Sequence, residues 1–158
     1  MHAAVPVAIS LGSNVGNRLE HLEHAIAALS RELQSVTVSS IVESQAAELA
    51  LGQPAYLNAV VTGETSLCAR ALLDRLLSLE NERGRARPYA MAPRTLDLDL
   101  LLYGSSVIDE DGLIVPHPRF RTREFVLGPL ASIAPEMVDP VTNKTVTQLL
   151  MELRDITD

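Results

Sequence analysis

Apolar and polar residues alternate over residues 96–100, and an unbroken apolar run continues to Leu102. A period of two that leads into an apolar run is typical of a β-strand entering a hydrophobic core. Because successive side chains of a strand point to opposite faces, we expect Asp97 and Asp99 to share one face while the flanking leucines pack behind the other. The pattern therefore predicts two carboxylates side by side on a rigid strand.

The other apolar patterns predict two helices and three further strands. Apolar residues recur at three- and four-residue spacing over residues 19–33, and Asn17 with Glu20 can form a capping box in front of them. A second apolar helix face covers residues 72–79, and this helix ends near Gly84. The three strands are predicted at residues 5–11, 36–42 and 56–62.

Residues 12–16, Gly-Ser-Asn-Val-Gly, join the first strand to the first helix. The segment looks like a phosphate-binding loop, but it lacks the lysine and the spacing of one. We interpret it as a tight turn in which Gly12 and Gly16 adopt backbone conformations that other residues resist.

The resulting order of elements is βαββαβ, which is the ferredoxin-like pattern. It predicts an α+β fold in which an antiparallel sheet carries helices on one face and leaves the other face and its loops for ligands. Residues 126–153 predict short C-terminal helices, interrupted by Pro129, Pro135 and Pro140. We expect residues 1–158 to form one domain, because a chain of this length can bury a sizeable core.

Composition and charge exclude several classes of protein. A net charge of −7 and an isoelectric point near 5.0 argue against the basic footprint of a nucleic-acid-binding protein. The single cysteine, Cys68, excludes an intrachain disulfide and a multi-cysteine zinc site, and we expect it to be a buried or half-buried thiol. Residues 5–11 are too short to span a bilayer, and no basic stretch precedes them. We expect a cytoplasmic protein with no membrane or nucleic-acid partner and no obligatory protein partner.

Basic residues gather around the two aspartates. A lone Asp-x-Asp is most simply explained as an amphipathic strand whose carboxylates face water. However, seven of the 13 Lys and Arg residues lie in this region of an acidic chain, which favours a bound polyanion. Adjacent carboxylates repel each other, a divalent cation relieves that repulsion, and hard oxygen ligands suit Mg²⁺. The seven are Arg83, Arg85, Arg87, Arg94, Arg119, Arg121 and Arg123.

Residues 93–104, Pro-Arg-Thr-Leu-Asp-Leu-Asp-Leu-Leu-Leu-Tyr-Gly, resemble the signature of the 6-hydroxymethyl-7,8-dihydropterin pyrophosphokinase family of the folate pathway. Stretches at residues 11–14, 56–60, 115–119 and 123–127 agree with the family in the same order, so the resemblance covers nearly the whole chain. It implies transfer of pyrophosphate from ATP to the hydroxymethyl group of 6-hydroxymethyl-7,8-dihydropterin, with attack at the β-phosphorus and release of AMP.

The resemblance also implies roles for individual residues. Asp97 and Asp99 would hold two Mg²⁺ ions that bridge the triphosphate, and Asp97 would also face the pterin hydroxyl. Arg85 and Arg94 match arginines that contact the phosphates and guide closure, and we expect both to act in catalysis with the aspartates. Contacts to the nucleotide are implied for Glu80, Arg87, Arg94, Leu100, His117 and Arg123. Contacts to the pterin are implied for Ser44, Tyr56, Asn58, Met91, Asp97 and Phe125.

Taken one at a time, several of these residues have simpler explanations. Glu80 lies near a helix C-terminus, where a carboxylate is mildly unfavourable, and it is either a ligand contact or a solvated surface charge. Tyr56 and Phe125 are equally consistent with core packing. His117 stands between two prolines and is better suited to donate a hydrogen bond from a rigid turn than to bind a metal. Asn58 lies in an apolar strand, where a buried amide needs partners.

The chain departs from the family pattern in two loops. Residues 44–48, Ser-Gln-Ala-Ala-Glu, replace the usual Thr-Pro-Pro stretch, with one extra residue before Tyr56. Met91 stands where the family carries a tryptophan, in a loop about one residue shorter. A methionine covers a ring adaptably but packs less rigidly, so we expect altered substrate affinity or lid closure without loss of chemistry.

Two other classes of function remain open. A ferredoxin-like module can bind RNA or a regulator without catalysis, although the acidic chain, with only five Phe and Tyr residues, lacks the paired aromatics and basic surface of RNA-binding versions. A metal-dependent phosphohydrolase would need a water-activating base beside the aspartates, and none is evident.

Overall fold

The computed structural model describes residues 3–44, 55–84 and 95–157. Its centre is an antiparallel sheet with the strand order β2-β4-β1-β5. The central strand β1 (Val5–Ser13) pairs with β4 (Tyr56–Thr65) on one side and β5 (Asp97–Tyr103) on the other. The predicted ferredoxin-like α+β fold is therefore confirmed, with β1 placed between the strand that carries Asn58 and the strand that carries the two aspartates.

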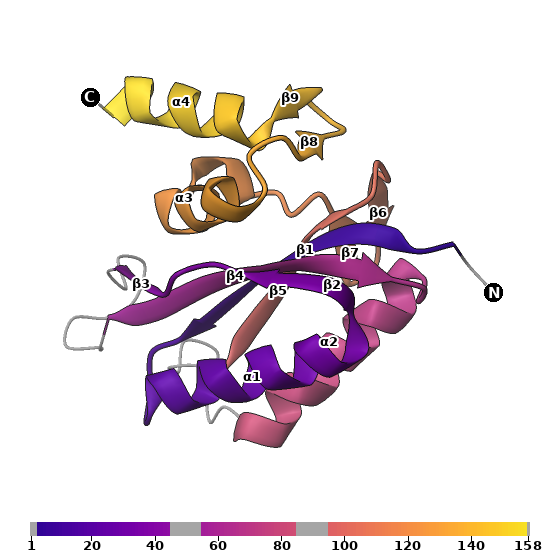
Figure 1. Cartoon of the computed structure of the whole chain (residues 1–158), viewed down its shortest axis with the longest axis vertical. Helices are drawn as coiled ribbons and strands as arrows, with labels where there is room; N and C mark the ends of the chain where they lie inside the picture. Colours follow the sequence, from indigo (N-terminus) through magenta and orange to yellow (C-terminus); the bar gives the residue numbers. More distant parts are fainter. Residues whose placement is uncertain (1–2, 45–54, 85–94, 158) are drawn as a thin grey trace.

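One face of the sheet is covered by α1 (Arg18–Glu32) and α2 (Ala69–Gly84), as Figure 1 shows below the strands. The first helix begins with the predicted capping box. Asn17 Oδ1 accepts a hydrogen bond from the backbone N–H of Glu20 at 3.1 Å, and the Asn17 amide donates to Glu20 Oε2 at 3.2 Å. Leucines of both helices pack against the apolar sides of β1 and β5 and form the larger of two hydrophobic clusters.

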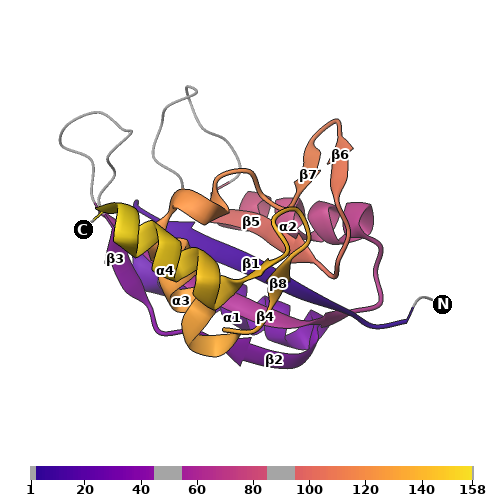
Figure 2. The same ribbon diagram turned by 90° about the horizontal axis from the view of Figure 1, so that it is seen from above.

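The other face of the sheet is not left free, and this part of the prediction is wrong. Helices α3 (Glu124–Ile133) and α4 (Val146–Thr157) lie above it, and Figure 2 shows them over β1 and β4. Apolar side chains on this face, among them Val60 and Leu101, need cover and pack into a second hydrophobic cluster with these helices. Pro129 lies inside α3 and does not interrupt it.

The predicted strand at residues 36–42 is two strands, β2 (Gln34–Val38) and β3 (Val42–Ser44). Both pair with β4, and the break falls at Ser39. The Ser39 N–H donates to Val60 O at 2.9 Å, but its hydroxyl, rather than its carbonyl, accepts the Val60 N–H at 2.8 Å. A side chain that replaces a backbone acceptor ends the regular ladder without loss of a hydrogen bond.

Two short hairpins and a 3₁₀ turn complete the described chain. The hairpins are formed by β6 (Ile108–Glu110) with β7 (Leu113–Val115) and by β8 (Val138–Asp139) with β9 (Lys144–Thr145), and the turn is η1 (Phe120–Thr122). Within the ranges that the structure describes, no helix is long and apolar enough to cross a membrane.

Two smaller predictions need correction. Cys68 is exposed, because it lies just ahead of the first turn of α2 rather than on its buried face. Gly12 is a strand residue outside the left-handed region, and only Gly16 takes the positive φ (70°) that favours glycine.

Candidate active site

Asp97 and Asp99 lie on the same face of β5, as the alternation predicts. Burial alternates along the strand: both aspartates are partly exposed, and Leu98 and Leu100 between and after them are buried in the cluster between the sheet and helices α1 and α2. Leu100 is 5% exposed, which leaves its backbone as the part that can contact a nucleotide. The carboxylates therefore project from the face opposite α1 and α2.

The sheet register extends this pair into a polar row across three strands. Gly12 of β1 is directly opposite Asn58 of β4 on one side and Asp97 of β5 on the other. Ser10 is opposite Asp99 in the same way. Because directly opposite residues of antiparallel strands share a face, Asn58, Gly12 and Asp97 lie in line.

Asn58 is 6% exposed, and its amide has the partners that a buried polar group requires. Its Nδ2 donates to Ser44 Oγ at 2.8 Å and to Val42 O at 3.3 Å. The Tyr56 ring is close by: its Cδ1 lies 3.4 Å from the point that a Cβ on Gly12 would occupy, and Asn58 Oδ1 lies 3.5 Å from the same point. The predicted pterin contacts Ser44, Tyr56 and Asn58 are thus brought together at one end of the row.

His117 lies beside the other end of the row, with Nε2 3.7 Å from Asp99 Oδ1. The His117 N–H donates to Leu101 O at 3.0 Å, and its Nδ1 accepts from the Arg119 N–H at 3.2 Å. Burial and the nearby Arg123 guanidinium lower the pKa of His117, although the Asp97 carboxylate opposes them. A neutral ring whose Nδ1 is an acceptor carries its proton on Nε2, which is the nitrogen nearer Asp99.

Glu80 of α2 reaches the strand that carries the aspartates. Its Oε2 accepts a hydrogen bond from the backbone N–H of Leu98 at 2.7 Å, and the residue is half-buried. The interpretation of Glu80 as a solvated surface charge is therefore wrong. The carboxylate ties the end of α2 to β5 at the residue between Asp97 and Asp99.

Phe125 is a partly buried residue at the start of α3 that packs against the second hydrophobic cluster. The guanidinium carbon of Arg123 lies 5.8 Å from the centroid of its ring, within the range of a cation–π contact. The partly buried Phe125 thus contributes to core packing and keeps part of its surface open for a ligand.

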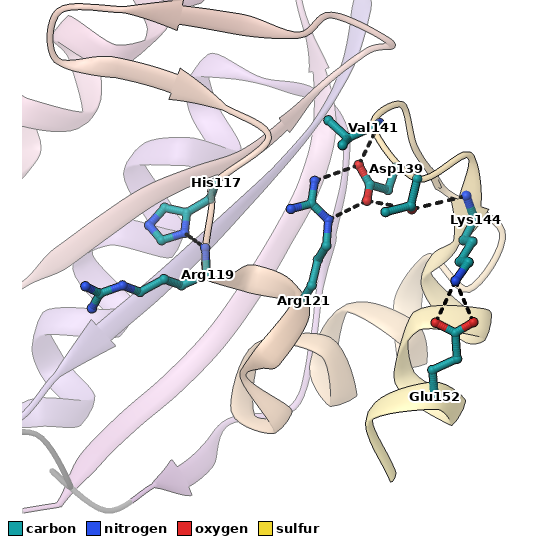
Figure 3. Close-up of polar contacts among 8 residues, drawn as sticks. His117, Arg119, Arg121, Asp139, Val141, Lys144 and Glu152 are labelled. Atoms are coloured by element: carbon teal, nitrogen blue, oxygen red, sulfur yellow. Dashed lines mark hydrogen bonds and ion pairs between the residues drawn. The ribbon is translucent and has the colours of Figure 1, made fainter. Parts of the chain in front are cut away.

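Two arginines of the basic cluster are engaged elsewhere. Arg83 donates to His21 Nδ1 at 3.0 Å and pairs with Glu20 at 3.2 Å, which joins α2 to α1. Arg121 forms a two-bond ion pair with Asp139, and Figure 3 shows it directed away from His117 and Arg119. The sequence did not point to Asp139, because no local pattern links it to Arg121.

Four of the predicted site residues, Arg85, Arg87, Met91 and Arg94, lie outside the described residues, as do residues 45–48. Within the described ranges, no group of three or more His, Cys, Asp and Glu side chains is placed to hold a metal ion. The Asp97 and Asp99 carboxylates share one face of β5 and could hold a cation there. The fold and these side chains define a ferredoxin-like α+β domain with a carboxylate pair beside a buried amide and an imidazole.

Residues 8–135 match the family described as 7,8-dihydro-6-hydroxymethylpterin-pyrophosphokinase. The chain is 42% identical to the 2-amino-4-hydroxy-6-hydroxymethyldihydropteridine pyrophosphokinase of Synechocystis sp., over 96% of this chain and 76% of the relative. It is 41% identical to the enzyme of that name from Haemophilus influenzae, over 93% of this chain and 92% of the relative.

A solved structure of wild-type HPPK-DHPS from Plasmodium falciparum has the same fold, with a TM-score of 0.73 at 13% identity over 96% of this chain. This chain spans 45% of that longer protein. The chain belongs to the 7,8-dihydro-6-hydroxymethylpterin-pyrophosphokinase family. The activity of the family is pyrophosphoryl transfer in folate biosynthesis, and the predicted resemblance is confirmed.

Proposed function

We propose that this chain transfers pyrophosphate from ATP to the hydroxymethyl group of 6-hydroxymethyl-7,8-dihydropterin in a Mg²⁺-dependent reaction. The pterin hydroxyl oxygen bonds to the β-phosphorus, the bond from that phosphorus to the α,β-bridging oxygen breaks, and AMP leaves. The hydroxyl proton is released. The observation that carries the proposal is the row across β4, β1 and β5, which puts Asn58 and Asp97 on one face with Gly12 between them.

The side chains of the site fit Mg²⁺. Asp97 and Asp99 offer hard oxygen ligands from one strand face, and the described residues add no third carboxylate. Mg²⁺ suits such a site because it commonly binds one or two carboxylates and completes its octahedron with phosphate oxygens and water. When bound, it neutralises phosphate charge and orients the attacking and leaving oxygens.

The protein's own contribution is positioning and charge neutralisation, which dominate phosphoryl-type transfer. His117 carries its proton on the nitrogen nearer Asp99, so its N–H can bias the orientation of that carboxylate electrostatically. Glu80 fixes the backbone of β5 between the two aspartates. We assign phosphate contacts to Arg85, Arg87, Arg94 and Arg123, and further nucleotide contacts to Glu80, Leu100 and His117.

The pterin would occupy the end of the row where Tyr56, Asn58 and Gly12 meet. A flat heteroaromatic ring with a polar edge needs stacking faces and a few amide contacts. Asn58 Nδ2 is used by Ser44 and Val42, so the oxygen of the same amide is the group best suited to accept a hydrogen bond from the ring edge. We assign further pterin contacts to Ser44, Met91 and Phe125.

We also propose that residues 1–158 act as one pyrophosphokinase domain in the cytoplasm. The cysteine content supports this setting, because a single cysteine cannot form an intrachain disulfide, and disulfides are typical of oxidising compartments.

Product analysis tests the reaction. The chain is incubated with ATP, Mg²⁺ and the pterin, and nucleotides are separated by anion-exchange chromatography while free phosphate is assayed in parallel. We expect AMP and pterin diphosphate in equal amounts, with neither formed when the pterin or Mg²⁺ is omitted. Free phosphate without AMP would contradict the proposal and favour a phosphohydrolase. Binding of ATP without any product would favour a module without catalysis.

A further inference from the structure

The Arg121–Asp139 ion pair differs from the exposed ion pairs of the described residues in its burial and in the number of hydrogen bonds to its carboxylate. The Asp139 side chain is fully buried, and it receives Arg121 Nε at 2.6 Å and a second Arg121 nitrogen at 3.0 Å. It also accepts the Val141 N–H at 3.0 Å and the Thr142 hydroxyl at 2.8 Å. Burial by itself would raise the pKa of Asp139, but these hydrogen bonds, with those from Arg121 foremost, hold the pKa below its usual range.

Arg121 lies in the middle of the segment that leads from β7 to α3. Residues 117–123 of this segment begin with His117 and end with Arg123, and we call them the site segment. Its first residue is held by the bond from the His117 N–H to Leu101 O at 3.0 Å. Phe120, next to Arg121, is fully buried in the second cluster.

We propose that Asp139 is a positioning residue: through Arg121 it fixes the site segment, and so holds His117 and Arg123 where they meet the nucleotide. Figure 3 shows the arrangement, with His117 and Arg119 on one side of the segment and Asp139 on the other. The nucleotide part of this inference rests on the proposed function, but the fixing of the segment does not.

The physical basis is the cost of an unpaired buried charge. A surface ion pair opens readily because water replaces the lost partner. Asp139 has no exposed surface, so separation from Arg121 would leave a buried carboxylate without its counter-charge. The pair therefore disfavours any movement of the site segment away from the β8–β9 hairpin. Without the Arg121–Asp139 ion pair, the site segment would occupy the position that binds the nucleotide for only a fraction of the time. The apparent affinity for the nucleotide then falls by that fraction.

The test replaces Asp139 by Asn, which removes the charge and keeps the shape. Arg121→Lys is the second variant, because it keeps the charge and loses the two-bond geometry. Glu152→Gln is the matched control: Glu152 of α4 pairs with Lys144 of the same hairpin, but this pair is exposed and lies on the far side of Asp139 from the site segment in Figure 3. Amide hydrogen exchange by NMR and steady-state kinetics are measured on all of them.

We expect the amides of the site segment to exchange about tenfold faster in Asp139→Asn while those of β1 and β4 are unchanged. We expect the KM for ATP to rise about fivefold, with the pterin KM within about twofold of the parent value. Arg121→Lys should show the same pattern at reduced size, and Glu152→Gln should show neither effect.

Unchanged exchange in the site segment of both variants would overturn the proposal. Uniformly faster exchange over the whole chain would also overturn it, because the pair would then be a general stabilising element. Local opening without a change in the KM for ATP would separate the segment from the nucleotide and overturn its role in positioning. If the parent protein forms no AMP, the proposed function fails, and the exchange data still decide whether Asp139 fixes the segment.

Discussion

His117 Nε2 lies 3.7 Å from Asp99 Oδ1, while the opposite ring nitrogen accepts the Arg119 N–H. This arrangement couples the tautomer of one residue to the orientation of another. The backbone donor occupies Nδ1, so the proton stays on Nε2 and faces the carboxylate. The ring thereby presents its Nε2–H toward a proposed metal ligand, at a distance longer than a hydrogen bond.

Replacement of His117 should therefore weaken catalysis without unfolding the chain. At 3.7 Å the contact is longer than a hydrogen bond, so its electrostatic contribution is smaller, and we expect His117→Ala to lower kcat/KM by about 3- to 10-fold. Arg119→Ala is the control, because it keeps the backbone donor that sets the tautomer. Steady-state AMP formation measures both. A smaller loss in His117→Ala than in Arg119→Ala would contradict the orienting role.

Asp97 and Asp99 should be needed for turnover but not for folding. Both carboxylates project from the partly exposed side of β5, and the leucines on the other side hold the strand in the core. We expect Asp97→Ala and Asp99→Ala each to lower kcat by at least about 10³-fold, since loss of one preorganised electrostatic group alone removes 10²–10³. Circular dichroism and thermal melts check the fold. Unfolding of both variants would instead indicate a structural role.

Glu80 accepts a hydrogen bond from the Leu98 N–H and also carries a negative charge. Two substitutions distinguish what each of these contributes to stability. Glu80→Ala removes the acceptor, and we expect it to lower the free energy of unfolding by about 1–3 kcal/mol. Glu80→Gln keeps an acceptor oxygen and should lose less than about 1 kcal/mol. Urea denaturation measures both variants. Equal losses in the two would show that the charge, and not the hydrogen bond, stabilises β5.

The sequence predicts the parts of the site that depend on local periodicity. Alternation around Asp97 and Asp99 fixes their shared face, because a strand side chain has only two directions available. The capping box at Asn17 is equally local, and the structure contains it. The same reasoning fails at Ser39, where a side-chain hydroxyl takes over a backbone hydrogen bond and divides one predicted strand into two.

Contacts between distant segments could not be predicted in this way. Asp139 is 18 residues from Arg121, and no spacing rule links a buried carboxylate in one turn to an arginine in another. The prediction that the second face of the sheet is free of helices was wrong for a related reason. Periodicity shows that α3 and α4 have apolar sides, but not which surface those sides meet. The arginine count around the aspartates therefore overstated the site, because Arg121 is engaged by Asp139 and Arg83 by Glu20.

Gly12 should matter because it lacks a side chain. It lies in line with Asn58 and Asp97, and a Cβ there would be 3.4 Å from Tyr56 Cδ1 and 3.5 Å from Asn58 Oδ1. The backbone accepts other residues, so Gly12→Val should fold but fill the space proposed for the pterin. Overpacking of this kind costs about 1–3 kcal/mol, so we expect the pterin KM to rise about 10- to 100-fold.

The KM for ATP in the same variant is the internal control, because the nucleotide is assigned to the other end of the row. Gly12→Ala should give a smaller effect of the same kind, since it adds one methyl group at ordinary contact distance. A pterin KM that is unaffected by Gly12→Val would place the ring elsewhere.

Stability should fall on mild acidification through His21, which joins α1 to the end of α2. Its Nδ1 accepts a hydrogen bond from Arg83 Nε, so the contact requires the unprotonated nitrogen. Burial and the Arg83 charge lower the pKa of His21. The unfolded chain then binds the proton more readily than the folded chain, so the free energy of unfolding is highest above the ordinary value of 6.5 and decreases as the pH falls below it.

His21→Gln removes the titrating group and keeps an acceptor within reach of Arg83. We expect it to flatten the dependence of unfolding free energy on pH between about pH 6.5 and about pH 5, by roughly the 1 kcal/mol of one hydrogen bond. His117 has a lowered pKa and contributes with the same sign, so part of the dependence should remain. Urea denaturation at several pH values measures the slope. An identical slope in parent and variant would show that protonation of His21 leaves the contact between α1 and α2 intact.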